Sequence, residues 1–188
     1  MGVDKALLSF REQTLLERAL QTAAVVSSPV VIVGPQDRYA AFGDVIEDVY
    51  AGCGPLAGIH AALSATEADL NLILSVDIPL MTSDFLRWLL KRAGDAVEWA
   101  VVPDALGGQQ PLCALYRRPL RALAEQALKD GDYKIGHLLA RVPTLYISEV
   151  EMREGGFSPK IFRNINTGDE YEALMRDESV TSTKGGKR

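Results

Sequence analysis

Cysteine is nearly absent from this chain of 188 residues, which contains only Cys53 and Cys113. Neither belongs to a C-x-x-C pair, and each stands in apolar or glycine-rich surroundings without a nearby histidine. Disulfide scaffolds and cysteine-based metal sites need clustered cysteines at characteristic spacings. We therefore exclude both classes and expect two small, buried thiols in a reducing compartment.

Long hydrophobic runs are also missing. The longest strongly apolar stretch, LNLILSV at residues 70–76, is far shorter than the roughly 20 residues that a membrane-spanning helix needs. No basic segment followed by an apolar one marks a secretion signal. We therefore expect a cytoplasmic protein that is not embedded in a membrane.

An excess of positive charge is the third absence. Twenty lysines and arginines stand against 25 aspartates and glutamates, which gives a net charge of −5. Such a surface has no overall field that attracts nucleic acid or an anionic membrane. A polyanionic substrate would therefore need local positive charge from a few basic side chains, helix N-termini or a divalent metal.

Strand-like and helix-like segments alternate through the first hundred residues. Helical spacing or caps predict helices at 14–24, 35–43, 54–66, 82–94 and 119–131, and one near Asp169; β-branched or apolar runs predict strands at 29–34, 44–49, 70–77, 99–104 and 144–150. This alternation is typical of an α/β fold with a doubly wound, mainly parallel sheet between two helical layers. We expect one domain over residues 1–176 and a disordered polar tail over 177–188.

Ligands of such sheets bind beyond the carboxyl ends of the strands. After one predicted strand, Asp48 leads into a glycine-rich turn and a helix that contain Gly54, Pro55 and Gly58. A helix that begins in this way offers backbone N–H groups and a favourable dipole to an anion. A tight strand-to-helix connection without a ligand is the alternative.

Asp77 ends the most apolar predicted strand, and Pro79 then turns the backbone out of the sheet. A carboxylate at such an edge can hold Mg²⁺, which commonly binds one or two carboxylates together with waters and substrate phosphates. The alternative role for Asp77 is to cap the next turn. Asn164 and Asn166 stand before the last predicted helix, where they could meet a ligand together or form a turn.

A dinucleotide site is a further alternative. GCGPLAG at residues 52–58 is a G-x-G-x-x-x-G pattern, and Asp77 follows about twenty residues later, as in an NAD(P)-binding fingerprint. This would indicate an oxidoreductase. Against it, at least one predicted strand precedes the pattern, whereas the fingerprint normally follows the first strand.

Five motifs resemble, in order and spacing, the molybdenum cofactor guanylyltransferase family: MGVDKALL, GPLAGI, SVDIPLM, QPLCALY and FRNINT, spread over residues 1–167. The resemblance implies a Rossmann-like nucleotidyltransferase. Such an enzyme joins GMP from GTP to molybdopterin, releases pyrophosphate and uses Mg²⁺. Its partners would be GTP, molybdopterin or its molybdenum-loaded form, and molybdoenzyme maturation proteins.

The resemblance also assigns residues on the nucleotide side. Lys5 would contact the phosphates and act in catalysis, Asp48 would bind the nucleotide, and Asp77 would hold the metal and act in catalysis. The turn that favours guanylyl over cytidylyl transfer consists of Gly54, Pro55, Leu56, Ala57 and Gly58. Gly34 stands where some members carry an asparagine that contacts nucleotide.

On the pterin side, the resemblance places Gln110, Pro111, Asn164 and Asn166, and Lys134 could meet the pterin phosphate. Three alternatives stay open. The chain could be a cytidylyl or sugar-phosphate nucleotidyltransferase, the NAD(P)-dependent oxidoreductase described above, or a non-catalytic protein that carries the pterin.

In the resembling family, an apolar strand and a glycine-rich loop with basic residues precede the Met-Gly-x-Asp-Lys motif, and that loop wraps the nucleotide phosphates. Here the motif is at Met1. A central strand is hard to omit, since its neighbours would keep unpaired backbone groups and an open apolar face. We therefore expect that Met1 is an internal methionine of the loop and that the sequence is a truncated or mis-started version of a longer protein.

Overall fold

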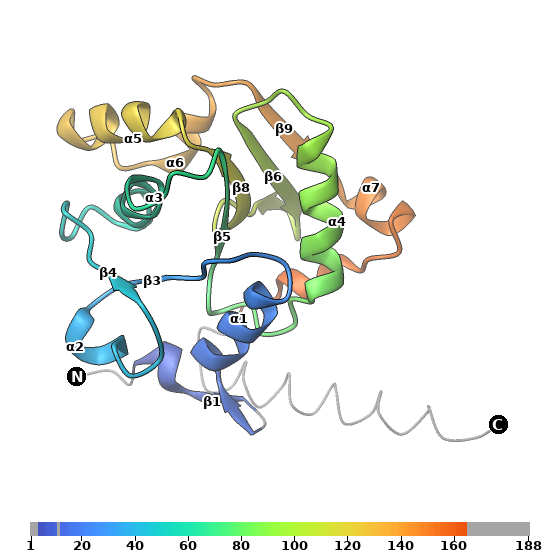
Figure 1. Ribbon diagram of the computed structural model, residues 1–188. Coiled ribbons are helices and arrows are strands. Elements are labelled where there is room, and N and C mark those ends of the chain that lie inside the picture. Colours follow the sequence, from blue (N-terminus) through green and yellow to red (C-terminus); the bar gives the residue numbers. More distant parts are fainter. Residues whose placement is uncertain (1–3, 11, 165–188) are drawn as a thin grey trace.

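The computed structural model describes residues 4–10 and 12–164, in an α/β arrangement (Figure 1). Its first half carries short strands and helices around one longer strand. These elements are η1 (Lys5–Leu7), β1 (Ser9–Phe10), β2 (Gln13–Thr14), α1 (Leu15–Ala24), β3 (Ile32–Val33), α2 (Gln36–Tyr39), β4 (Val45–Ile46), α3 (Pro55–Ser64) and β5 (Leu70–Leu74).

The second half completes the main sheet and supplies most of its covering helices. Its elements are α4 (Ser83–Gly94), β6 (Ala100–Ala105), β7 (Gly108–Gln109), β8 (Cys113–Arg117), α5 (Leu120–Lys129), α6 (Ile135–Leu139), β9 (Thr144–Ile147), α7 (Glu149–Glu154) and η2 (Pro159–Phe162).

The main sheet is mixed. β8 lies between β5 and β6 and is antiparallel to both; β7 pairs antiparallel with β6, and β9 pairs parallel with β6. β8 reverses direction because only a short connection through β7 separates it from β6, and parallel neighbours need a longer crossover. The α/β class is therefore confirmed, but the ladders of the described residues do not confirm a mainly parallel sheet.

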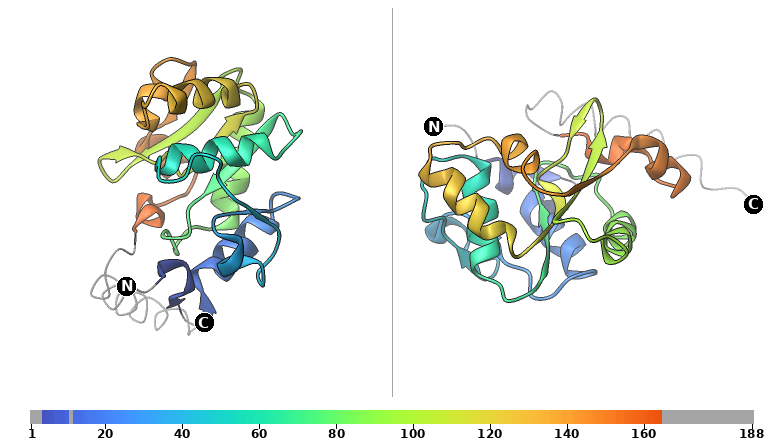
Figure 2. Two further views of the ribbon diagram at one scale, coloured as in Figure 1. Left: turned by 90° about the vertical axis from the view of Figure 1, so that its left-hand side faces the viewer. Right: turned by 90° about the horizontal axis from the view of Figure 1, so that it is seen from above.

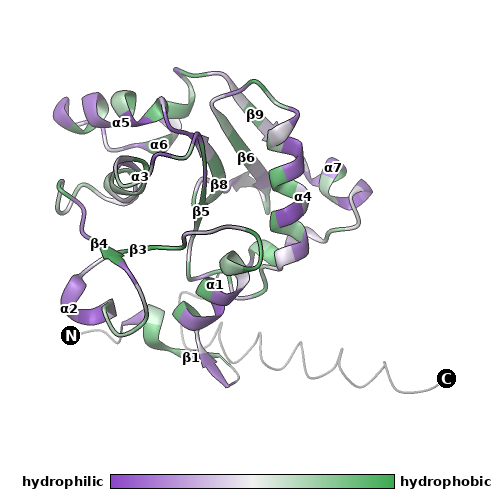
Figure 3. Cartoon of the chain, viewed as in Figure 1, coloured by the Kyte–Doolittle hydropathy of each residue, from purple (hydrophilic) through white to green (hydrophobic). Residues whose placement is uncertain are grey.

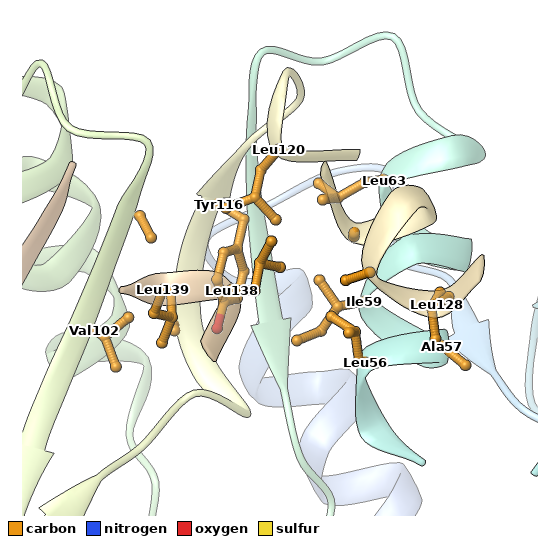
Figure 4. Close-up of a cluster of buried hydrophobic side chains, with 14 residues drawn as sticks. Leu56, Ala57, Ile59, Leu63, Val102, Tyr116, Leu120, Leu128, Leu138 and Leu139 are labelled. Atoms are coloured by element: carbon orange, nitrogen blue, oxygen red, sulfur yellow. The ribbon is translucent and has the colours of Figure 1, made fainter. Parts of the chain in front are cut away.

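Two apolar cores cover opposite faces of this sheet. One joins α3, α5 and α6 to the sheet (Figure 4), and it contains Leu56, Leu63, Tyr116 and Leu128. The other joins α4, α7 and η2 to the sheet and contains Phe85, Leu89, Met152 and Phe162. Figures 1 and 2 show the sheet between α3 and α5 on one side and α4 on the other, so helices cover both faces as predicted.

β3 and β4 form a separate parallel pair, in the register Ile32 to Val45 and Val33 to Ile46. Figure 1 shows this pair beside β5, and among the described residues no ladder joins the two sheets. All five residues of β5 are half-buried, whereas nearly continuous apolar runs are typical of strands that are covered on both faces. The difference arises because one edge of β5 faces a cavity, which is described below.

Local sequence explains where the helices begin. Thr14 and Glu17 form a capping box at α1, and the Thr82 hydroxyl accepts the N–H of Phe85 at α4. α4 is amphipathic, with polar and apolar sides that are visible in Figure 3. The Ser148 capping box starts α7, and for this reason the strand predicted at 144–150 ends at Ile147.

Most predicted helices are confirmed, with ends shifted by a few residues: α1, α2, α3, α4 and α5. The sequence did not predict α6 or α7, which are short. The helix expected near Asp169 and the tail at 177–188 lie outside the described residues. Within the described ranges, no helix is long and apolar enough to cross a membrane.

The capping box gives a stability prediction. Thr14→Ala removes the hydroxyl that accepts the N–H of Glu17 at 3.1 Å, and we expect a loss of about 1 kcal/mol in the free energy of unfolding. For a chain of this size that corresponds to a fall of roughly 2–4 °C in Tm, measurable by calorimetry. Thr14→Ser keeps the hydroxyl and should stay near wild type; an equal loss in both variants would contradict the capping role.

Candidate functional site

The glycine-rich turn leads directly into α3. Gly54 has φ 72° and ψ −165°, in a region that favours glycine, and Pro55 occupies the first helical position. Leu56 and Ala57 are almost completely buried in the core, so their side chains cannot meet a ligand. Since Pro55 lacks an N–H and the N–H of Ala57 donates to the Gly54 carbonyl, the Leu56 amide is the donor that this first turn leaves for a ligand.

Asp77 lies in the loop that follows β5. Its Oδ1 accepts a hydrogen bond of 2.5 Å from the Ser75 hydroxyl, which fixes the orientation of the carboxylate. Within the described part of the chain, Oδ2 has no hydrogen-bond partner. Two residues later, the Pro79 carbonyl accepts a hydrogen bond from Nε of Arg18 on α1. The loop is therefore anchored on both sides of a carboxylate that keeps one oxygen available.

Lys5 is the first residue of η1, and its side chain is exposed. Several contacts hold the preceding residue, Asp4. The Asp4 carboxylate accepts the Ala6 N–H at 3.1 Å and the Tyr39 hydroxyl at 2.9 and 3.1 Å, and Arg38 lies 3.5 Å away. Partial burial and the Asp4 hydrogen bond raise the pKa of Tyr39. Because α2 follows β3, these contacts hold Lys5 at the carboxyl end of β3.

Gly34 allows this arrangement. A Cβ at Gly34 would lie 2.8 Å from the Tyr39 ring, so a larger residue would displace the tyrosine whose hydroxyl holds Asp4. The ring thus lies where an asparagine side chain would start, and this chain offers no side-chain contact to nucleotide from position 34.

The structure brings the segments of Lys5 and Asp77 together. Ala6 and Val76, their respective neighbours, pack in one apolar cluster with Leu16 and Ile32. A second cluster joins the same two segments further along, since Leu8 and Leu80 both pack on Phe10 and Leu15. The segments that carry Lys5 and Asp77 therefore pack against each other, beyond the carboxyl end of β5.

A cavity of about 510 Å³ connects this region to the glycine-rich turn. Its lining includes Asp48, Gly54, Pro55 and Gly58 on one side, and Ser75 and Val76 after β5 on the other. Its volume lies in the range of about 300–1,000 Å³ that is common for small-molecule sites. Asp48 and the turn thus border the same cavity as the end of β5, which the Asp77 loop follows.

The residues expected on the pterin side fall into two places. Gln110 and Pro111 precede Leu112, whose carbonyl accepts the Ser75 N–H at 2.6 Å, so they lie near the Asp77 loop. The Gln110 amide group donates to the carbonyls of Ala105 and Gly108. The side-chain NH₂ group of Gln110 therefore holds the β6–β7 hairpin, and the side-chain oxygen takes no part in these two bonds.

Lys134 lies on the other side of the site. Cys53 in the glycine-rich turn lies close to Tyr133, the neighbour of Lys134, and raises the pKa of the Tyr133 hydroxyl. Lys134 therefore belongs with the turn rather than with Gln110. Asn164 is exposed two residues after Phe162, which packs in the same core as Ile78, next to Asp77. Asn166 lies outside the described residues.

The side chains at this site fit a hard cation that is held mainly by the phosphates of a bound substrate. Among residues 4–10 and 12–164, no three His, Cys, Asp or Glu side chains gather into a metal-binding cluster. Asp77 supplies one oriented carboxylate, and Mg²⁺ commonly takes one or two carboxylates with waters and phosphates for the remaining positions. Such a site suits an ion that arrives with a nucleotide.

Sequence reasoning missed four positioning residues: Asp4, Arg18, Tyr39 and Ser75. Ser75 could have been found, because residues at i and i+2 of an extended segment point to the same side. Asp4 also carried a signal, since Asp is a preferred cap for a following helical turn. The contacts of Arg18 and Tyr39 join segments 61 and 35 residues apart, and no local pattern indicates such pairs.

Comparison with known proteins matches residues 1–145 to the model of the MobA-like NTP transferase domain family. A Bacillus subtilis protein named "Probable molybdenum cofactor guanylyltransferase" is 34% identical over 189 residues, covering 97% of this chain and 91% of its own length. A Clostridium perfringens protein of the same name is 29% identical and covers 94% and 90%.

Solved structures agree in fold. Molybdopterin-guanine dinucleotide biosynthesis protein A from Archaeoglobus fulgidus has a TM-score of 0.78 and 27% identity, covering 97% of this chain and 92% of its own. The 2-C-methyl-D-erythritol 4-phosphate cytidylyltransferase of Thermus thermophilus has a TM-score of 0.66 and 20% identity, covering 92% and 94%. At that identity the second likeness indicates a nucleotidyltransferase fold alone.

The Asp4 contacts give a prediction for the N-terminal segment. Tyr39→Phe keeps the ring and removes the hydroxyl that donates to the Asp4 carboxylate, and we expect a loss of about 1.5–3 kcal/mol in the free energy of unfolding. Amide hydrogen exchange at Ala6 and Leu7 should become faster. Tyr146→Phe, at an exposed tyrosine of β9, is the matched control. Unchanged exchange at Ala6 in Tyr39→Phe would show that the hydroxyl does not hold η1.

Proposed function

The chain belongs to the family of MobA-like NTP transferase domains and is a nucleotidyltransferase, and we propose that it transfers GMP from GTP to molybdopterin. Two observations support this most. Ala6 and Val76, the neighbours of Lys5 and Asp77, pack in one apolar cluster, and Asp48 and the glycine-rich turn line one cavity with Ser75 and Val76. Ligands of α/β sheets bind beyond the carboxyl ends of the strands.

In the proposed reaction, a phosphate oxygen of molybdopterin attacks the α-phosphorus of GTP. A new P–O bond joins GMP to the pterin phosphate, the bond from the α-phosphorus to the bridging oxygen breaks, and pyrophosphate leaves. Such a transfer depends on alignment and charge neutralisation more than on a protein nucleophile. The absence of a strongly nucleophilic side chain from the proposed set is consistent with this.

Each residue has a proposed role. Lys5 contacts the phosphates, and Asp48 and the start of α3 bind the nucleotide, with the Leu56 amide as a donor and the side chains of Leu56 and Ala57 kept in the core. Asp77, oriented by Ser75, would hold Mg²⁺, which would neutralise charge on the phosphates. Because the whole chain is acidic, this local gathering of positive charge is needed to bind a triphosphate.

Molybdopterin is proposed to lie toward Gln110, Pro111 and Asn164. Leu112, next to Pro111, accepts the Ser75 N–H, and Phe162, two residues before Asn164, packs in one core with Ile78. Asn166 completes the Asn-x-Asn motif in this proposal. Lys134, whose neighbour Tyr133 lies close to Cys53 of the glycine-rich turn, is proposed to meet the pterin phosphate. Product would pass to molybdoenzyme maturation proteins.

Guanine specificity is the finer part of the proposal. GPLAG favours GTP over CTP, and the names of the relatives agree with a guanylyltransferase. The runner-up is a cytidylyl or sugar-phosphate nucleotidyltransferase with the same fold, as in the Thermus thermophilus structure. Family membership leaves little support for an NAD(P)-dependent oxidoreductase, and a pterin carrier would bind molybdopterin without turnover.

Nucleotide selectivity follows from this proposal. In the presence of Mg²⁺, GTP at about 100 times its Kd should stabilise the protein by about 2.7 kcal/mol, which raises Tm by roughly 5–10 °C. CTP, UTP and NAD(P) at equal concentration should raise Tm by less than about 2 °C, the smallest shift that 1 kcal/mol produces in this size class. A larger shift with CTP would favour the cytidylyl alternative, and a shift with NAD(P) would overturn the assignment.

The metal assignment has its own test. Asp77→Asn keeps the size of the side chain and removes its charge, so Mg²⁺-dependent GMP transfer should fall by at least about 10²-fold, as for other electrostatic groups at reacting phosphates. Asp84→Asn, at an exposed aspartate on α4, is the control and should keep full activity. Release of pyrophosphate from GTP with loaded molybdopterin is the measurement; retained activity in Asp77→Asn would refute the role of Asp77.

A further inference from the structure

His60, in the second turn of α3, is a polar side chain inside an apolar core, with 6% of its surface exposed. Its Nε2 lies 3.3 Å from the Ser64 hydroxyl. Its Nδ1 is buried and has no hydrogen-bond partner within the described residues. A buried polar atom without a partner is costly, so the presence of this ring calls for an explanation. The proposed phosphate transfer does not use it.

The ring of Tyr50 packs on His60. The two ring centroids lie 5.3 Å apart at an interplanar angle of 80°, an edge-to-face arrangement that is favourable for aromatic rings. Tyr50 is half-buried against the core that joins α3 to α5 (Figure 4). The contact therefore ties the second turn of α3 to the loop that precedes this helix.

That loop is the glycine-rich turn. The Tyr50 carbonyl accepts the N–H of Cys53 at 3.1 Å, which closes the bend directly before Gly54. Asp48, two residues before Tyr50, lines the cavity beside Gly54, whereas the intervening Val49 is 82% exposed. Tyr50 and Cys53 are thus the side chains that hold this loop on the core.

The neutral form of the His60 ring suits its surroundings, and the charged form does not. A neutral imidazole has one N–H, and the Ser64 hydroxyl can accept it from Nε2. Protonation would add an N–H at Nδ1, for which the described residues provide no acceptor. It would also place a charge in the core, and burial accordingly lowers the pKa of His60.

Charged groups of α5 also face His60. After burial, which has the largest effect, the Glu125 carboxylate raises the pKa of His60, and the cations of Arg121 and Lys129 lower it. Glu125 lies 2.7 Å from Lys129 and 3.8 Å from Arg121, so its charge is shared with both. An imidazolium at position 60 would therefore meet more positive than negative charge from α5.

From these contacts we infer that neutral His60 is a positioning residue for the nucleotide: it holds the glycine-rich turn through the Tyr50 ring, and its protonation releases the turn. This inference rests on the proposed role of the turn in binding GTP. A protonated ring turns toward water, and its contact with Tyr50 is lost. The loop then populates other conformations, which lowers the apparent affinity for GTP. Binding should weaken as the pH falls below about 6.5, the ordinary pKa of histidine.

The first measurement needs no nucleotide. Between about pH 7.5 and about pH 5, the protection of the Cys53 amide against hydrogen exchange should fall by at least about threefold, because each pH unit below the pKa of His60 can shift the population of the released turn by up to tenfold. Protection factors corrected for the intrinsic exchange rate at each pH report this by NMR. In His60→Phe, which keeps an aromatic ring beside Tyr50 and takes up no proton, protection should not depend on pH.

The second measurement is the Kd of Mg²⁺–GTP by calorimetry over the same range. It should rise in the wild type by at least about threefold more than in His60→Phe, a comparison that cancels the titration of GTP itself. Tyr50→Ala releases the turn at every pH, so it should bind weakly throughout; it replaces His60→Phe if that variant does not fold. His137→Gln, at the second histidine of the chain, is the matched control and should respond as the wild type does.

Three results would overturn the inference: a wild-type pH response in His60→Phe or Tyr50→Ala, loss of the response in His137→Gln, or constant protection of Cys53 in the wild type. Absence of Mg²⁺–GTP binding at the higher pH would refute the proposed function. Normal binding there, with no difference between wild type and His60→Phe at the lower pH, would refute the role of His60 alone.

Discussion

The antiparallel pairing of β5 with β8 is the constraint on which the site depends. Five residues of β5 pair with five of β8, and the ladder continues into the bond from the Ser75 N–H to the Leu112 carbonyl. This ladder sets where β5 ends, and thus where Ser75 can orient Asp77. It also brings the segment of Gln110 and Pro111 to the same point. A shift of one residue in this register would reverse which side chains face each core.

The two edges of β5 border regions that are stabilised in different ways. On the β8 side, β5 belongs to a well-packed sheet between two cores, with Phe85, Leu89, Leu115 and Tyr116 fully buried. On the other side, a cavity separates β5 from β3. The elements beyond it, β3, β4, α1 and η1, are held by two small apolar clusters and by the polar contacts of Asp4 and Arg18. This second region buries less apolar surface, so its polar contacts contribute a larger part of its stability.

Much of the fold follows from local sequence signals, and much of the site does not. Helical periodicity and caps predicted α1, α3, α4 and α5. The rule that ligands bind beyond the carboxyl ends of strands indicated Asp48 and Asp77 as candidates. The mixed sheet was not predictable from alternation, because the direction of β8 depends on the hairpin through β7. Contacts such as Tyr39 with Asp4 depend on tertiary packing, which no spacing along the chain encodes.

The central claim is that Lys5, Asp48, the start of α3 and Asp77 act as one nucleotide site. An NMR titration of backbone amides with Mg²⁺ and GTP tests it most directly, because each amide reports on its own surroundings. The account predicts the largest shifts at Ala6, Leu56, Gly58 and Asp77, with loss of these shifts when the metal is chelated. Shifts confined to distant elements such as α7 and β9, or shifts of equal size at the four amides without metal, would contradict it.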